Sequence, residues 1–503
     1  MIGIGGRIAK GAAWIAASRV VISVLGFVNV LVLARLLTPE DFGLVAIVMA
    51  ASAIMMAATE LSLSQALVQH RDPEEAHYHT AFTINLLRAV IVAAIAVALS
   101  GPVAAAYGDA RLGPLFLSIG FSALIVGAIN PRLALMSRDL VFWQDFATRA
   151  SDKLVAVVTS IAVAAIWQSY WVLVIGVVAG QVCALVVSYV IIPFRPRLSL
   201  SRWRDLMSFS IWVGLGQAVN TINWRFDQLL AGYMLGNAQL GYYSVGDRLA
   251  VLPTREATQP VAQAVFPGFA RLADDPPRLR AAYRRAQTAL SAVALPAGVG
   301  FAVTAEPLVL LAMGEDWRPV IPVIQILASI FAVQTLATPV QPLAMGLGAT
   351  RALFNRSVLT LAIRVPITVF GLLAGGLMGL LWARCATGLI GMAINMHLVT
   401  RLIAVPVLQQ VTGNARTLAA TAAMAAATHG AGQALTPGDA GTLPALLLQA
   451  GGMIATGALI YPAAMLGLWF AAGRPDGPER DMIHFGGASL AAARLRLTAR
   501  PAG

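Results

Sequence analysis

The chain has 503 residues, of which 58% are hydrophobic and 12% are charged, and its formal net charge is +12. Soluble globular proteins carry about 25% charged residues, so this composition excludes a soluble protein whose whole surface is hydrated. The mean hydropathy of +0.76 predicts an integral membrane protein.

Apolar runs follow one another along the whole chain and are separated by short polar loops. They predict about fourteen membrane-spanning helices, each of roughly the length that crosses a hydrocarbon core. The first six lie at residues 12–33, 42–63, 81–105, 114–135, 150–167 and 170–192. The other eight lie at 207–232, 241–267, 286–305, 320–346, 354–374, 377–400, 415–434 and 444–472.

Basic residues alternate between the loops, which predicts how the chain is oriented. The loops at 168–170, 236–241, 375–376 and 436–442 contain none. The loops assigned to the other side, and the C-terminal tail, carry clusters of Arg, for example at 195–204, 271–285 and 494–500. Because basic residues gather in cytoplasmic loops, we expect both termini in the cytoplasm. These short clusters do not form the continuous basic stripe that nucleic-acid binding requires, so no nucleic-acid partner is expected.

An internal repeat predicts the domain organisation. A shift of 198 residues places Phe42-Gly43 on Leu240-Gly241 and Trp14 on Trp212. The offset spans six helices, which predicts a parallel repeat, a plan known in transporters. The predicted fold is an all-α membrane protein with two six-helix lobes and two further helices. Its parts are an N-terminal lobe at 1–195, a C-terminal lobe at 205–401, two additional helices at 414–472 and a cytoplasmic tail at 473–503.

Polar side chains inside the predicted spans mark a candidate substrate pathway, since such groups are costly in a membrane. In the seventh span Asn220, Asn223 and Asp227 recur at spacings of three and four and share one helix face. In the first span Arg19 lies about two turns from the cytoplasmic end. Arg19 either lines the pathway or extends to the cytoplasmic headgroups.

The eighth span carries a polar stripe along its length. Its members are Ser244, Arg248, Arg255, Gln259 and Gln263. Three prolines recur every seven residues in or beside this span, which predicts kinks next to a cavity. Guanidinium groups bind phosphate and amides bind hydroxyls, so the stripe suits an anionic, sugar-bearing solute. A structural alternative to substrate binding stays open for both arginines. In it, Asp247 neutralises Arg248 and Glu256 neutralises Arg255. Three further arginines inside spans either line the cavity or pair with carbonyls: Arg88, Arg364 and Arg384.

Signatures of enzymes and of metal or cofactor sites are missing from the sequence. It contains no GxxxxGK[ST] phosphate loop, no HExxH and no GxSxG motif. The histidines are scattered, and both cysteines fall inside predicted spans. We therefore expect a protein that is not an enzyme and that needs neither a cofactor nor a metal.

Several motifs, taken in order, resemble those of bacterial polysaccharide flippases. This family belongs to the multidrug/oligosaccharidyl-lipid/polysaccharide exporter superfamily. The resemblance covers residues 7–405. It rests on Leu33-Ala34-Arg35-Leu36-Leu37-Thr38-Pro39-Glu40-Asp41-Phe42-Gly43-Leu44, Arg138-Asp139-Leu140-Val141-Phe142, Leu240-Gly241-Tyr242-Tyr243-Ser244 and Gly314-Glu315-Asp316-Trp317.

The resemblance implies a V-shaped, two-lobed carrier in the cell inner membrane. Such a carrier flips undecaprenyl-pyrophosphate-linked oligosaccharide from the cytoplasmic to the periplasmic face by alternating access, for exopolysaccharide or lipopolysaccharide synthesis. Arg19 and Arg255 match cavity arginines of related flippases by position, and Asp227 lies within a shared motif.

The implied partners are the lipid-linked oligosaccharide and membrane lipids, with a polysaccharide polymerase and export machinery as candidates. Three alternative functions stay open. They are a multidrug or cation antiporter of the same superfamily, a membrane-embedded glycosyltransferase or polymerase, and a scaffold that transports nothing.

Overall fold

The computed structural model describes residues 21–61, 63, 67, 73–133, 143–435 and 442–474, without the side chains of 207–215, 260, 263 and 264. These residues are largely helical, and none of them is in a strand. Contacts divide the chain into two compact units. Unit 1 contains residues 1–245 and 357–380, and unit 2 contains residues 246–356 and 381–503. The units group residues by contact, so the two repeat-based lobes stay a prediction.

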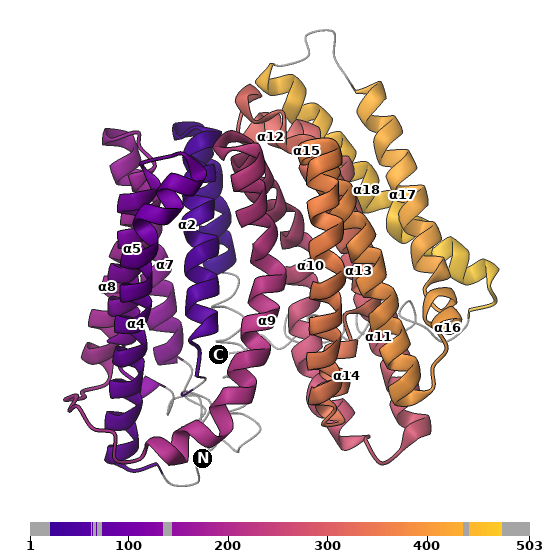
Figure 1. Ribbon diagram of the computed structural model, residues 1–503. Helices are drawn as coiled ribbons and strands as arrows, with labels where there is room; N and C mark the ends of the chain where they lie inside the picture. The colour runs from indigo at the N-terminus through magenta and orange to yellow at the C-terminus, as the bar shows by residue number, and fades with distance from the viewer. Residues whose placement is uncertain are drawn as a thin grey trace, which may run out of the picture. The chain divides into compact units, whose positions relative to one another are not determined.

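Unit 1 is built from long helices that pack in pairs. A short apolar helix, Val21–Leu36, leads into it. The next helices are α2 (Pro39–Ala58), α4 (Glu75–Tyr107), α5 (Leu112–Gly127), α7 (Trp143–Ile166), α8 (Trp171–Ile191) and α9 (Trp203–Leu235). Helix α4 packs against α5, α7 against α8, and α2 against α9 (Figure 1). The unit also takes in the start of α10 (Asn237–Arg271) and part of α15 (Thr350–Ile403).

Unit 2 contains the rest of α10 and α15 together with the shorter helices. These are α11 (Pro276–Val303), α12 (Ala305–Ala312), η1 (Glu315–Trp317), α13 (Val320–Gln334), η2 (Thr335–Ala337), α14 (Val340–Gly346), α16 (Val407–Thr412), α17 (Ala415–Ala434) and α18 (Leu443–Ala471). Helix α11 packs against α13 and α17, and α17 lies along α18 (Figure 1).

Helix α15 contains a break in the middle, at Gly375 and Gly376. Gly376 has φ +55° and ψ −132°, a backbone conformation that side chains with a Cβ rarely adopt. Beyond the break, Gly379 lies so close to the carbonyl of Gly371 that a Cβ would collide with it. The break separates the two helices that the sequence predicts at 354–374 and 377–400.

The structure confirms an all-helical, multi-pass membrane protein. Seven of the described helices are long and apolar enough to cross a membrane: α2, α4, α8, α11, the segment 320–346, α15 and α18. The described part of every predicted span overlaps a helix. Because α15 is one assigned helix over two predicted spans and several other helices are short or polar, the number of fourteen crossings stays a prediction.

Helices α9 and α10 differ from the rest because they are long but not apolar throughout. Each exceeds 30 residues, yet neither is among the apolar helices. Polar side chains on a helix within a membrane bundle need protein or water beside them. The polar groups on α9 and α10 are therefore the candidate functional groups of the two units.

Candidate functional site

The turn before α2 begins a polar cluster in unit 1. Thr38 caps α2, since its Oγ1 accepts from the Asp41 amide, and the Asp41 carboxylate accepts from the Thr38 amide at 3.0 Å. Pro39 occupies the first helical turn, where its missing N–H costs nothing. This capping box explains why the Thr-Pro-Glu-Asp sequence starts a helix here, and it fixes where Glu40 projects.

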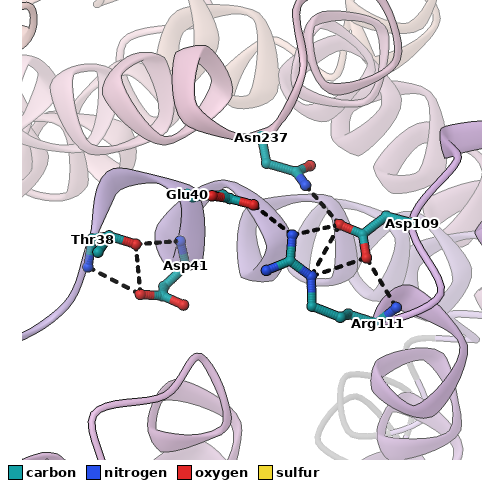
Figure 2. Close-up of polar contacts among 6 residues, drawn as sticks. All are labelled: Thr38, Glu40, Asp41, Asp109, Arg111 and Asn237. Atoms are coloured by element: carbon teal, nitrogen blue, oxygen red, sulfur yellow. Dashed lines mark hydrogen bonds and ion pairs between the residues drawn. The ribbon is translucent and has the colours of Figure 1, made fainter.

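Arg111 lies at the centre of this cluster, as Figure 2 shows. Its guanidinium donates to Glu40 Oε1 at 2.5 Å and to Asp109 Oδ2 at 2.8 Å. Asn237 Nδ2 donates to the same oxygen of Asp109 at 2.9 Å. The guanidinium also lies 6.0 Å from the ring centroid of Tyr170. Glu40 and Asn237 lie in the first turns of α2 and α10, whereas Asp109, Arg111 and Tyr170 lie in the turns before α5 and α8. Arg111 contacts Glu40, Asp109 and Tyr170 directly, and Asp109 connects the cluster to Asn237, so four segments meet at one end of unit 1.

The two acidic partners change the electrostatics of the cluster. Hydrogen bonding to Arg111 lowers the pKa of Asp109 below its usual value, although partial burial opposes this effect. Hydrogen bonds to Asp109 and Glu40 raise the pKa of Arg111. Asp109 and Arg111 are therefore both ionised at neutral pH.

Two glycines next to this cluster make a reciprocal contact. A Cβ on Gly43 would collide with the carbonyl oxygen of Asn237, and a Cβ on Gly241 would collide with the carbonyl oxygen of Pro39. The offset of 198 that relates Gly43 to Gly241 also relates Pro39 to Asn237. Under the predicted repeat, a two-fold relation between the copies accounts for this reciprocity. The first turns of α2 and α10 are thus in backbone contact.

Deeper in unit 1, Asp227 on α9 is buried and paired. Arg364 Nη2 on α15 donates to Asp227 Oδ2 at 2.9 Å, and the Tyr243 hydroxyl on α10 donates to the same oxygen at 2.8 Å. The two charged residues are only 1% and 8% exposed. The Arg364 guanidinium also lies 5.4 Å from the ring centroid of Phe226. These contacts join α9, α10 and the first part of α15.

The other two candidates on α9 lie on the same face, as the spacing predicts. Asn223 is buried, and its Nδ2 donates to the Ser357 carbonyl on α15 at 2.9 Å. Its Oδ1 is buried without a hydrogen-bond donor among the described residues. Asn220 is half-buried. Asn223 and Asp227 therefore both anchor α9 to α15, while Asn220 remains partly accessible.

The stripe on α10 lies in unit 2 and is accessible. Arg248, Arg255 and Gln259 are all exposed, and their spacings of seven and four put them on one helix face. Arg255 interacts with its neighbour Glu256 at 3.3 Å, as one of the predicted alternatives has it, yet its side chain is still 46% exposed. The side chain of Gln263 lies outside the described residues.

The other arginines inside helices are also paired. In unit 2, Arg384 Nη2 donates to Asp247 Oδ1 at 3.0 Å, so one partner of Asp247 is Arg384. In unit 1, Arg88 contacts Glu60 at 2.8 Å and the Met56 carbonyl at 3.0 Å. Arg88 thus bonds a carbonyl, as one alternative has it, but both arginines also pair with carboxylates, which that alternative did not include.

The roles predicted for the site residues are not tested by their positions alone. Arg19 lies outside the described residues. Arg111, Asp109 and Asn237 are not among the predicted site residues, because each is in or next to a short turn, where polar residues are ordinary. The available signal was an Arg two residues after an Asp in a turn expected on the outer side, where basic residues are rare.

Comparison with known proteins identifies the family. The polysaccharide biosynthesis protein family matches residues 32–322. The lipopolysaccharide biosynthesis protein WzxC of Escherichia coli (strain K12) is 24% identical over 374 residues, which cover 74% of this chain and 76% of the relative. The succinoglycan biosynthesis transport protein ExoT of Rhizobium meliloti (strain 1021) is 23% identical over 420 residues, which cover 83% and 85% of the two chains.

Solved structures with low sequence identity share the fold. The lipid II flippase MurJ, in its inward closed conformation, matches with a TM-score of 0.68 and 13% identity over 90% of this chain and 100% of its own. An inward-facing MATE family transporter matches with a TM-score of 0.62 and 12% identity over 76% and 95% of the two chains. With the family match covering more than half of its length, the chain belongs to the polysaccharide biosynthesis protein family of membrane transporters, as its motifs indicate.

Proposed function

We propose that the chain is a flippase for a lipid-linked oligosaccharide. The cargo would be undecaprenyl-pyrophosphate-linked and would move from the cytoplasmic to the periplasmic face of the inner membrane, for exopolysaccharide or lipopolysaccharide synthesis. Both termini would be cytoplasmic. The names of the relatives WzxC and ExoT support the polysaccharide, and the fold shared with MurJ supports a carrier architecture.

The observation that carries this proposal is the exposure of Arg248, Arg255 and Gln259 on one face of α10. An exposed cationic stripe on a helix of a membrane bundle is stable only beside water or a polar ligand. Guanidinium groups offer two parallel donors to phosphate oxygens, and the amide of Gln259 suits sugar hydroxyls. Arg19 and Gln263 stay proposed cargo-binding residues from the sequence, and the Asn220 amide is proposed to bond cargo hydroxyls.

The paired residues have a different role in this proposal. Asp227 already accepts hydrogen bonds from Arg364 and Tyr243, so a cation of the chain itself neutralises it. We therefore infer that Asp227 braces α9 against α15 instead of binding a coupling ion. Asn223, which bonds the Ser357 carbonyl, would belong to the same brace.

Alternating access requires that one end of the pathway closes while the other opens. The backbone contact of Gly43 and Gly241, with the Arg111 cluster beside it, supports a closed end where α2 and α10 begin. Under the predicted topology this end faces the periplasm. Release of the cargo would separate the two helix ends and break the hydrogen bond between Asn237 and Asp109.

The decisive experiment is to delete the gene and analyse the lipids that accumulate. A flippase predicts loss of polymer export and accumulation of a lipid-linked oligosaccharide with its sugar on the cytoplasmic face. The lipid should be extractable and should disappear when the gene is restored. Normal export after deletion would sink the proposal. A polysaccharide polymerase and export machinery remain candidate partners, to be sought by co-purification.

A multidrug or cation antiporter is the second candidate, because the fold is shared with a MATE family transporter. The cationic stripe on α10 would repel cationic drugs, which favours an anionic cargo. Drug susceptibility of the deletion strain separates the two, since an antiporter predicts sensitivity without accumulated lipid. The relatives are transporters and not enzymes, so a glycosyltransferase or polymerase is not proposed.

A further inference from the structure

A basic cavity lies at the opposite end of unit 1 from the Arg111 cluster, where α4 begins and α8 ends. Its volume is about 490 Å³, which lies within the range of about 300–1,000 Å³ typical of small-ligand sites. Arg132, Arg195 and Arg197 line it together with Glu75, His79 and Phe194. None of these residues belongs to the proposed substrate pathway.

The cavity has an excess of positive charge. Glu75 forms an ion pair with Arg132 and neutralises it. The guanidinium groups of Arg195 and Arg197 have no hydrogen bond or ion pair with any described residue, and both residues are exposed. Two unpaired cations therefore face a space large enough for a ligand. Their natural complement is an oxyanion that accepts paired N–H donors.

The walls of the cavity are held in place by hydrogen bonds from the linker to α4. The amide of Arg197 donates to His79 Nδ1 at 3.3 Å, and the amide of Ser199 donates to Thr83 Oγ1 at 2.9 Å. On the other side, Arg132 Nη1 donates to the Pro193 carbonyl at 3.1 Å. A site whose backbone is fixed in advance loses less entropy when a ligand binds.

Aromatic groups form the floor. Phe194 is buried and stacks on His79 with ring centroids 5.3 Å apart. The Arg132 guanidinium lies 5.2 Å from the Phe194 ring centroid. Because His79 Nδ1 accepts a hydrogen bond, neutral His79 carries its proton on Nε2 and can donate a further hydrogen bond there. The floor thus adds one donor to the two free guanidinium groups.

An apolar stripe on α8 leads towards the cavity. Val182, Val186 and Val190 recur every four residues and are 41%, 55% and 75% exposed. They share one helix face, and Val190 lies three residues before Pro193. In a membrane protein such a face contacts acyl chains. Chains along α8 would place a lipid headgroup at the basic cavity.

We propose that this cavity binds the phosphate of an anionic lipid headgroup. Arg195 and Arg197 are its direct ligands, and acyl chains lie along the α8 stripe. Basic pockets between membrane helices bind acidic headgroups in this way. The acyl-facing stripe favours a lipid over free phosphate, which has the same anionic group without chains. The site is separate from the proposed transport pathway.

Lipid retention by the purified full-length protein tests the proposal, with native mass spectrometry as the readout. The probes are phosphatidylglycerol, neutral phosphatidylcholine and inorganic phosphate. The wild type should retain phosphatidylglycerol and not phosphatidylcholine. Arg195→Gln/Arg197→Gln should weaken retention by at least about tenfold, since two charge-assisted hydrogen-bond donors are lost.

The control removes the same charge elsewhere, as Arg204→Gln/Arg401→Gln, at two exposed residues outside the cavity. It should retain phosphatidylglycerol like the wild type. Equal retention by the wild type and the cavity variant would overturn the proposal, and so would equal retention of both lipids. Displacement of the lipid by millimolar inorganic phosphate would overturn the lipid assignment. Because the measurement involves no transport, it stands or falls independently of the proposed flippase function.

Discussion

Gly43 near the start of α2 and Gly241 near the start of α10, which the predicted repeat makes equivalent, each lie against a backbone carbonyl of the other helix. Gly43 meets Asn237 and Gly241 meets Pro39, so the starts of α2 and α10 touch without intervening side chains. Asn237, whose carbonyl oxygen meets Gly43, also donates a hydrogen bond to Asp109 in the Arg111 cluster (Figure 2). In the proposed mechanism, this small contact and the single guanidinium with several partners would form and break as a unit.

Replacing either glycine should loosen this contact. Gly43→Ala or Gly241→Ala introduces a Cβ that overlaps a carbonyl oxygen, and we expect a loss of about 1–3 kcal/mol in stability together with reduced export. The double variant should lose less than the sum, because the first substitution already separates the helix ends. Thermal unfolding in detergent and polymer export measure the two effects.

Gly430→Ala is the matched control, since a Cβ there meets no atom within 4 Å. Because Ala has a higher helix propensity than Gly, this variant should be neutral or slightly stabilised. Equal losses at Gly430 and Gly43 would refute the role of the contact.

Removing the Arg111 charge should weaken the same closure. Arg111→Gln leaves Glu40 and Asp109 without their shared cation, so the four segments are no longer tied together. Because Arg111 is partly exposed, we expect a stability loss of only about 1 kcal/mol but a clear loss of export. Arg111→Lys should rescue incompletely, since an ammonium lacks the planar fork that bridges two carboxylates.

Arg318→Gln is the control, because Arg318 pairs with Glu315 and Glu306 in an exposed turn of unit 2. It should export normally. Full rescue by Arg111→Lys would show that charge alone suffices and that the bridging geometry does not matter.

The closure should depend on pH only in acid. The hydrogen bond from Arg111 lowers the pKa of Asp109, so the stabilisation is complete above the ordinary Asp pKa of about 3.9. It is lost as the pH falls through the lower pKa of the folded protein. The stability difference between wild type and Asp109→Asn should therefore be constant from about pH 8 to pH 5 and shrink only below about pH 4. A difference that already shrinks near neutral pH would contradict this.

Breaking the buried pair of Asp227 and Arg364 should be costly. Asp227→Asn leaves Arg364 as a buried, uncompensated charge, for which we expect a loss of about 3–5 kcal/mol and poor membrane accumulation. Arg364→Met in the same chain removes that charge and should restore accumulation and part of the export. A coupling-ion role predicts the opposite, namely a double variant that accumulates normally and transports nothing.

The exposed stripe on α10 should matter for cargo and not for folding. Arg255→Ala removes a side chain that is 46% exposed, so membrane accumulation should remain normal while export falls several-fold. Arg278→Ala, which removes a cation that is 79% exposed and paired with Asp275, is the control and should export normally. Unchanged export in Arg255→Ala would count strongly against the proposed pathway.

Much of the fold was predictable because each membrane helix is specified locally. The run from Val320 to Gly346 and the pair of runs around Gly375-Gly376 appear as helices where hydropathy places them. The spacing of Asn223 and Asp227 correctly predicted a shared face on α9. In contrast, the sequence did not show whether Arg364 lines a cavity or forms a pair, because its partner Asp227 is 137 residues away in the chain.

Local chemistry by itself determined the helices of this protein, its membrane environment, its family motifs and the equivalence of Gly43 with Gly241. These features depend on periodicity, hydropathy and capping, which act within a few turns of chain. Only the tertiary structure decided which charges are neutralised. It pairs Asp227 with Arg364 and brings four segments together at the Arg111 cluster, while the Arg255 side chain stays accessible. The effect of a charged side chain depends on the groups within a few ångströms of it. When those groups come from distant parts of the chain, the order of residues in the sequence does not specify them.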